Sequence, residues 1–232
     1  LLLMSVPGIA CYNTFVYVAL QTTQVANTTM TVCAAPALIL IFMRMFFGEK
    51  ISTRALVGII LSFSGVVYLL TQGNLASLSD FSFGEGELWA LAAALAWSLY
   101  SVLLKKRPPE IGQRSFVLFT FIMGALILLP FAIYEHNYVT AFPVTTNSVL
   151  AVFYVAILAS ILAYIMWNRA ISLAGPNKIG VFLYLFPVFA SLGAAIFLGE
   201  RLEAYHGVGV VLVIGGIYLL LKKNTQPKPS YQ

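Results

Sequence analysis

Long apolar stretches separated by short polar ones dominate this chain. Stretches of roughly 20 residues, the length needed to cross a bilayer, recur eight times, at residues 1–21, 27–47, 54–73, 86–104, 115–134, 148–168, 179–198 and 205–221. Runs such as VLFTFIMGALILLPFAI at 117–133 are apolar on every face, whereas strands of a transmembrane barrel alternate apolar with polar residues. The pattern predicts an all-α polytopic membrane protein with eight spanning helices.

The charged residues predict how these helices are oriented. Eight spans place both ends of the chain on one side, and of the 13 Lys and Arg residues only Arg201 falls on the other side. The excess of cations in cytoplasmic loops therefore predicts a multi-pass protein of the inner (cell) membrane with both termini of this chain in the cytoplasm. The net charge of +5 comes from these separate loops, so the lipid bilayer is an expected partner and nucleic acid is not.

The two ends of the chain resemble each other when the sequence is shifted by 151 residues. The segment APALILIFMRMFFGEK at 35–50 then falls on FPVFASLGAAIFLGER at 186–201, with Pro36 on Pro187 and Glu49 on Glu200. An odd number of helices separates equivalent points, so the two copies cross the membrane in opposite directions. Inverted repeats of this kind are found in secondary transporters, which bind substrate near the midplane between the repeats.

This register divides the chain into parts. Residues 1–73 supply the last three helices of a first repeat, and its first two helices would precede Leu1. An extracytoplasmic loop follows at 74–87, the second repeat of five helices occupies 88–223, and residues 224–232 form a cytoplasmic tail. We therefore expect an inverted repeat of five transmembrane helices, with ten helices in the full protein and eight in this chain.

Polar and aromatic residues recur on one face of two spans, where lipid-facing positions have no use for them. The 151-residue shift places Asn13 on Tyr164 and Tyr17 on Asn168, so each copy carries one Asn and one Tyr in swapped order. Trp167 lies beside the second pair. Two interpretations stand side by side: a polar, aromatic-lined substrate cavity, or hydrogen bonds that hold packed helices together.

Three further aromatic residues are candidates for the same cavity. Trp97 lies well inside its span, whereas Tyr100 lies nearer the cytoplasmic end, where an aromatic belt at the membrane interface is the alternative. Tyr184 precedes Pro187 by one turn and falls on Cys33 under the shift. Ordinary core packing is the alternative for Tyr184.

The duplicated prolines and glutamates are candidates for structural or gating roles. Pro36 and Pro187 each remove a helical hydrogen bond and predict a kink, which either shapes the bundle or bends during alternating access. The Gly-Glu pairs at 48–49 and 199–200 follow apolar runs, where glycine suits a helix C-terminus. We interpret Glu49 and Glu200 as architectural or gate-closing groups that meet the adjacent cation or a neighbouring helix end.

A proline followed by FFGEK or FLGER, and then the glycine-bearing helix GVGVVLVIGGIYLLLKK, resembles the drug/metabolite transporter superfamily, in particular its EamA-type ten-helix members. The resemblance covers nearly all of the chain. It implies a ten-helix fold with cytoplasmic termini and a central cavity between the halves. Members of this type include bacterial exporters of amino acids and other metabolites, but the shared motifs do not specify a substrate.

The residues within the spans narrow the cargo. No Asp, Glu or His lies in the middle of a predicted span to couple transport to protons, which disfavours a multidrug exporter. No Lys or Arg lies there to bind the anion of a sugar phosphate or nucleotide sugar, although such a carrier remains the nearest alternative. An intramembrane enzyme would need a motif such as HExxH, and His136 and His206 lie at helix ends.

We therefore expect a secondary transporter without enzymatic activity, cofactor or bound metal. Its predicted partner is a small-molecule metabolite, and export of amino acids or related metabolites by alternating access is the favoured function. The sequence leaves the oligomeric state open, a monomer included.

Overall fold

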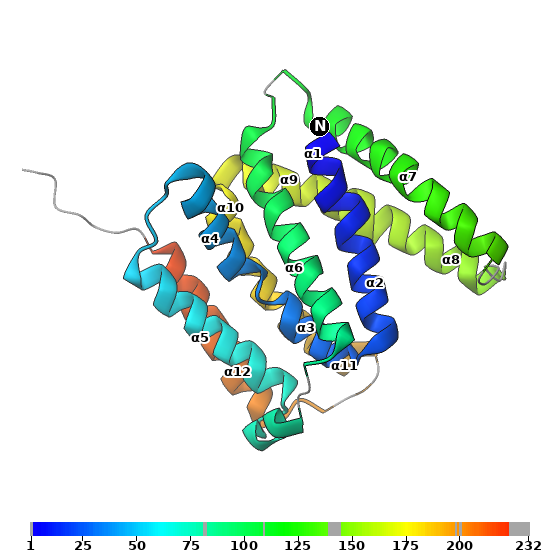
Figure 1. Cartoon of the computed structure of the whole chain (residues 1–232). Coiled ribbons are helices and arrows are strands. Elements are labelled where there is room, and N and C mark those ends of the chain that lie inside the picture. Colours follow the sequence, from blue (N-terminus) through cyan, green and yellow to red (C-terminus); the bar gives the residue numbers. More distant parts are fainter. Residues whose placement is uncertain are drawn as a thin grey trace, which may run out of the picture.

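The computed structural model describes residues 2–80, 83–108, 110–138, 145–197, 199 and 201–222. Within this part of the chain every regular element is helical (Figure 1). Eight helices there are long and apolar enough to span a bilayer: Leu2–Thr22, Val25–Phe47, Thr53–Leu70, Glu85–Lys106, Gln113–Glu135, Thr146–Ala174, Pro176–Phe197 and Ala204–Leu221. The prediction of an all-α polytopic membrane protein is confirmed. Glu200 and the predicted tail at 224–232 lie outside the described residues.

Several spans are built from consecutive helical elements of different type. The elements in chain order are α1 (Leu2–Ser5), η1 (Val6–Cys11), α2 (Tyr12–Thr22), α3 (Val25–Val32), α4 (Ala35–Phe47), α5 (Thr53–Leu70), η2 (Leu75–Asp80), α6 (Glu85–Leu103), η3 (Leu104–Lys106), α7 (Gln113–Tyr138), α8 (Thr146–Tyr154), η4 (Val155–Leu162), α9 (Ala163–Ala174), α10 (Pro176–Gly180), η5 (Val181–Leu185), α11 (Phe186–Phe197) and α12 (Ala204–Leu221). Of these, η1 and η4 are π-helical, and η2, η3 and η5 are 3-10 helices.

The helices that contain the duplicated prolines are interrupted at equivalent places. A turn at Cys33 and Ala34 separates α3 from α4, and Pro36 lies in the first turn of α4, where its missing N–H has no helical partner to lose. Pro187 is likewise the second residue of α11, directly after the 3-10 segment η5. The interruption therefore lies just before each proline.

The glycine of each Gly-Glu pair has the backbone conformation that its predicted role requires. Gly48 has a φ of 65° and Gly199 a φ of 72°, in the left-handed region that favours glycine. The amide of Gly48 donates to Arg44 O at 3.0 Å, and that of Glu49 donates to Met43 O at 3.4 Å. Gly48 thus ends α4 as a C-cap, and it directs Glu49 away from the helix.

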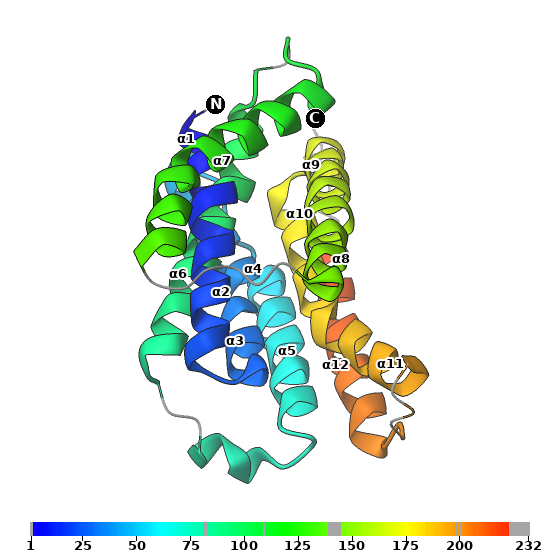
Figure 2. The same ribbon diagram turned by 90° about the vertical axis from the view of Figure 1, so that its right-hand side faces the viewer.

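Helices α5 and α12 lie antiparallel and side by side (Figures 1 and 2), and their contacts are reciprocal. A methyl group at Gly58 would lie 2.6 Å from Gly216 O, and one at Gly65 would lie 2.9 Å from Gly209 O. Under the 151-residue shift, Gly209 is the equivalent of Gly58 and Gly216 that of Gly65. Gly58 therefore meets the equivalent of Gly65, and Gly65 meets the equivalent of Gly58. Contacts exchanged in this way show that the two copies are related by a pseudo-two-fold axis.

The other spans form two groups on either side of a seam (Figure 2). In the first bundle, α1, η1, α2, α3 and α4 pack around α6, α7 packs on α1 and η1, and in the second bundle α8 to α11 follow one another. The bundles meet where α10 packs against α4 and where α7 packs against α9, while the main neighbours of α11 are α12, α5 and η5. The equivalent approach of α3 to α11 is not among the substantial contacts of the described chain, so the two copies differ in conformation.

Two predicted loops are wrong in detail. The predicted spans at 148–168 and 179–198 leave 169–178 as a loop, but α9 continues to Ala174, because the residues after Arg169 remain apolar and Arg169 can extend its charge toward water. Glu87 was expected in the outer loop, but it lies in the first turn of α6 and accepts a bond from Gly84 N at 2.9 Å. An acidic residue at this position satisfies a free amide of the helix start.

Candidate functional site

Five of the predicted cavity residues meet where α6 faces α9. Trp97 and Tyr100 belong to α6, and Tyr164, Trp167 and Asn168 belong to α9. The ring of Trp97 is central, because its centroid lies 5.2 Å from that of Trp167, 5.3 Å from that of Tyr164 and 5.6 Å from that of Tyr100. These distances are typical of interacting aromatic pairs. We call these five residues the aromatic cluster.

Hydrogen bonds join the cluster across the two bundles. Tyr100 OH donates to Asn168 Oδ1 at 2.8 Å, and Trp167 Nε1 donates to Ser101 Oγ at 3.2 Å. Asn13 Nδ2 donates to Tyr164 OH at 3.3 Å. Asn13 and Tyr164 are equivalent under the 151-residue shift, so the cluster lies close to the pseudo-two-fold axis.

The same axis is marked by a second bond between equivalent residues. Ser62 Oγ donates to Val213 O at 3.1 Å, and these residues are also 151 apart. A site on this axis is contacted by both copies, which is where inverted-repeat transporters bind substrate.

Two buried donors in the aromatic cluster have no hydrogen-bond partner among the described residues. They are Trp97 Nε1 and Asn168 Nδ2. A buried donor left unpaired costs about 1–3 kcal/mol, so both are free to bind an acceptor oxygen that enters the site. Burial also decides one alternative: Tyr100 is 0% exposed and Trp97 8%, so neither belongs to an interfacial aromatic belt.

Asn13 and Tyr17 line a cavity of about 590 Å³ between α2 and the α8–η4 helix. Phe121, Ser148 and Ser160 are also part of its wall. The volume lies in the range of small-molecule sites, and so does the composition, in which a few polar groups stand among apolar ones. Asn13 connects this cavity to the aromatic cluster through its bond to Tyr164.

Tyr184 lies apart from the other candidates. It is buried with Cys33, Val181 and Val188 in the core beside α5 and α12, rather than in the core that holds Trp97. Packing accounts for the position of its ring, while its hydroxyl, like the two donors above, has no hydrogen-bond partner among the described residues.

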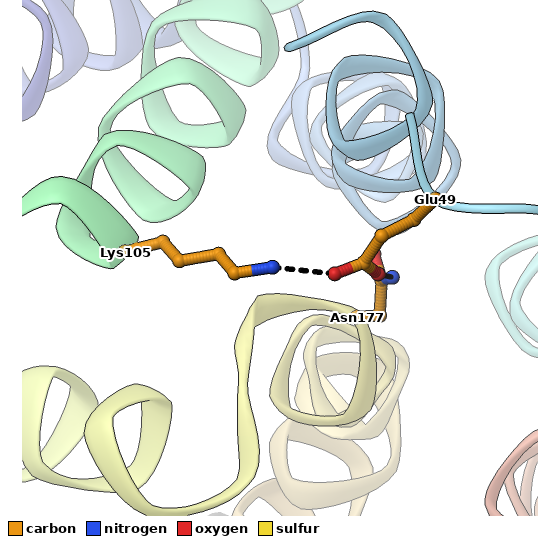
Figure 3. Close-up of polar contacts among 3 residues, drawn as sticks. All are labelled: Glu49, Lys105 and Asn177. Atoms are coloured by element: carbon orange, nitrogen blue, oxygen red, sulfur yellow. Dashed lines mark hydrogen bonds and ion pairs between the residues drawn. The ribbon is translucent and has the colours of Figure 1, made fainter. Parts of the chain in front are cut away.

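Glu49 joins the two bundles at the end of the protein where α4 and α6 finish (Figure 3). Its Oε1 accepts from Lys105 Nζ at 2.5 Å, and its Oε2 accepts from Asn177 Nδ2 at 2.6 Å. Lys105 belongs to η3 in the first bundle, and Asn177 to α10 in the second bundle. We call these three residues the Glu49 latch. The expected partner of Glu49 was a neighbouring helix end or the adjacent cation, and its partners lie at two neighbouring helix ends.

Two residues with close side-chain contacts were not predicted from the sequence, Tyr12 beside the cluster and Glu87 at the start of α6. The ring centroids of Tyr12 and Trp97 lie 4.6 Å apart. Tyr12 is not on the helical face that Asn13 and Tyr17 share, so the pattern of that face does not predict this contact. Glu87 is 2% exposed and accepts from Thr23 Oγ1 at 2.5 Å and from Asn27 Nδ2 at 3.1 Å. Its position three residues after Gly84, at the start of an apolar run, is a capping signal that could have revealed it.

Two helical copies related by a pseudo-two-fold axis, with a buried and uncharged polar cluster close to that axis, are features of membrane carriers of the secondary-transporter class. The sequence matches the EamA-like transporter family over residues 1–71 and 84–222. The chain belongs to this family, and the predicted resemblance is confirmed.

Relatives of this chain are described as transporters. An uncharacterized transporter of Archaeoglobus fulgidus is 28% identical over 96% of this chain and 76% of its own length. A probable amino-acid metabolite efflux pump of Salmonella typhimurium is 27% identical over 88% of this chain and 70% of its own length. A crystal structure with 22% identity has a TM-score of 0.77 and covers 95% of this chain and 75% of the solved chain, which shows a shared fold.

Proposed function

We propose that the protein exports small neutral or zwitterionic metabolites, amino acids in particular, across the inner (cell) membrane. The observation that carries this proposal is the pair of unpartnered donors, Trp97 Nε1 and Asn168 Nδ2, within the aromatic cluster. A carboxylate or carbonyl oxygen of the substrate accepts from these groups, and the rings of the cluster contact its apolar part. The description of the 27% identical Salmonella relative supports the same class of cargo.

The charges support a substrate without net charge. In the described spans, Asp, Glu, Lys, Arg and His occur only toward the helix ends. A substrate with net charge would need an opposite charge beside it once it leaves water. The middle of the described spans offers no cation for a sugar phosphate or nucleotide sugar, and no carboxylate for a cationic drug.

The contact between the bundles supports alternating access. On one side of the membrane α10 packs so closely on α4 that a methyl group at Gly180 would lie 2.8 Å from Ile39 Cδ1, and Asn177 binds Glu49 at the same end. The equivalent helices α3 and α11 do not pack in this way on the other side. We infer a state closed to the cytoplasm, and an exchange of conformations between the two repeats gives the opposite state.

The orientation follows from the cations. The latch end of the bundle carries the Lys and Arg of η3, α9 and α10, and an excess of these residues marks the cytoplasmic side. Both ends of this chain lie on that side in the proposed orientation.

Transport by the full-length protein in proteoliposomes tests the proposal. We expect Trp167→Ala and Asn168→Ala to reduce amino-acid transport at least about 30-fold, because removing a buried anchor of a binding site costs about 2 kcal/mol or more, as at other hot spots. Trp89→Ala is the matched control, because Trp89 lies on α6 but packs on Phe15 outside the cluster. Equal transport by all four proteins at equal amounts in the membrane would contradict the proposed site.

A further inference from the structure

A groove of about 720 Å³ lies between the start of α7 and the end of α9, outside the proposed transport site. Arg114 and Arg169 both line it, one from each helix. Neither guanidinium makes an ion pair or a side-chain hydrogen bond that we find within the described residues. Two exposed and unneutralised arginines therefore face one space.

The rest of the groove is apolar at its outer edge. Met166 is 64% exposed and Leu173 is 72% exposed, and both line the groove together with the arginines. Exposed apolar side chains on a spanning helix face hydrocarbon. Met166 lies one turn deeper in the span than Arg169, and Leu173 lies one turn nearer the helix end, so a ligand bound at the arginines meets lipid-facing apolar surface at Met166 on its deeper side.

A hydrogen bond joins the two helices that form the groove in this conformation. Gln113 Nε2 donates to Ile165 O at 2.6 Å, directly beside Arg114 in the sequence. Because α7 and α9 are held together here, the two arginines are presented on a connected frame rather than on independent loops.

We propose that this groove binds the phosphate headgroup of an anionic phospholipid of the cytoplasmic leaflet. The guanidinium groups of Arg114 and Arg169 donate to the phosphate oxygens, a pairing that suits the planar fork of arginine, and one acyl chain lies along Met166, on the deeper side of Arg169. Basic pockets between helices on the cytoplasmic side suit such headgroups. The inference uses the orientation proposed above and does not depend on the identity of the substrate.

Native mass spectrometry of the full-length protein released from nanodiscs tests this site. The nanodiscs contain phosphatidylcholine and phosphatidylglycerol at a ratio of about four to one, and the measurement is the fraction of protein that keeps a bound phosphatidylglycerol. We expect a retained phosphatidylglycerol on the natural protein, and about a fivefold weaker retention for each of Arg114→Gln and Arg169→Gln, from about 1 kcal/mol per basic residue near the surface. Arg44→Gln is the matched control, because Arg44 is an exposed arginine in the last turn of α4, outside the groove.

Further variants and a competitor separate the possible outcomes. The double variant Arg114→Lys with Arg169→Lys keeps the charge and should retain more lipid than the double glutamine variant. Thermal unfolding curves check that both variants are folded. Phosphatidylglycerol retained equally by the natural protein and the double glutamine variant would overturn the site. Displacement of the lipid by millimolar inorganic phosphate would instead assign the groove to a soluble anion and would also overturn the proposal.

Discussion

The geometry of the Glu49 latch predicts that removing one or the other partner of the Glu49 carboxylate has different effects on the conformation of the protein. Asn177→Ala removes a bond that crosses from the second bundle to the first, whereas Lys105→Gln removes a bond within the first bundle. Only a contact between the bundles has to break when the cytoplasmic end opens. The equilibrium between closed and open states should therefore respond to Asn177 more than to Lys105.

The structure sets the size of this difference. A hydrogen bond to a charged group contributes about 1.5–3 kcal/mol, and because Asn177 is only partly buried we take the lower end, which corresponds to about a tenfold change in the ratio of closed to open protein. The side chains of Lys105 and Glu49 are 41% and 38% exposed, so their ion pair is worth about 0.2–1 kcal/mol. Most of that energy is present in both states.

Thiol modification of Met43→Cys measures the open population. Met43 is 1% exposed and lies behind the latch on α4, so a reagent reaches it from the cytoplasm only when the bundles separate. In inside-out vesicles, and in a background without the native cysteines, we expect Asn177→Ala to raise the rate about tenfold and Lys105→Gln to raise it less than about threefold. Equal rates in both variants would refute the assignment of the latch to the bundle seam.

Two further predictions concern the repeat. Gly216→Ala places a methyl group 2.4 Å from a backbone carbonyl oxygen of α5, whereas at Gly215 the nearest atom is 3.7 Å away. Because overpacking costs about 1–3 kcal/mol and alanine gains about 1 kcal/mol of helix propensity, Gly216→Ala should lower the Tm in detergent and Gly215→Ala should not. An equal change of Tm in both variants would contradict the close packing of α5 on α12. Single cysteines at positions 27 and 178 should react with an impermeant thiol reagent from opposite sides of the membrane, and labelling from the same side would exclude the inverted topology.

Features that depend on period and composition were predictable from the sequence. The spans follow from apolar length, and the 151-residue register predicted the equivalence of Asn13 with Tyr164, which are in contact. Gly58 and Gly65 lie seven residues apart, which places them on one face of a helix, and each meets the equivalent of the other in α12. In each case a short pattern that occurs once in each copy of the repeat indicates a contact between residues far apart in the sequence.

Features that depend on the meeting of distant segments were not predictable. Nothing near Glu49 in the sequence indicates Lys105 or Asn177, because their approach depends on how α10 packs on α4. Tyr184 matched the cavity candidates in residue type, but the 3-10 segment η5 places it in a different core. The charge of Arg169 and the length of the apolar stretch predicted a helix end at residue 168, whereas α9 ends at Ala174. A long side chain such as that of Arg169 is compatible with a helix that continues to the membrane surface.

We propose that the uncharged aromatic cluster binds a transported substrate without net charge. Counterflow in proteoliposomes that hold the full-length protein tests this proposal, with a panel of neutral amino acids, a sugar phosphate and a lipophilic cation offered at equal concentration. We expect unlabelled neutral amino acids to drive uptake of a labelled one, while the other two compounds do not exchange. Exchange of the sugar phosphate or the cation in place of the amino acids would contradict it.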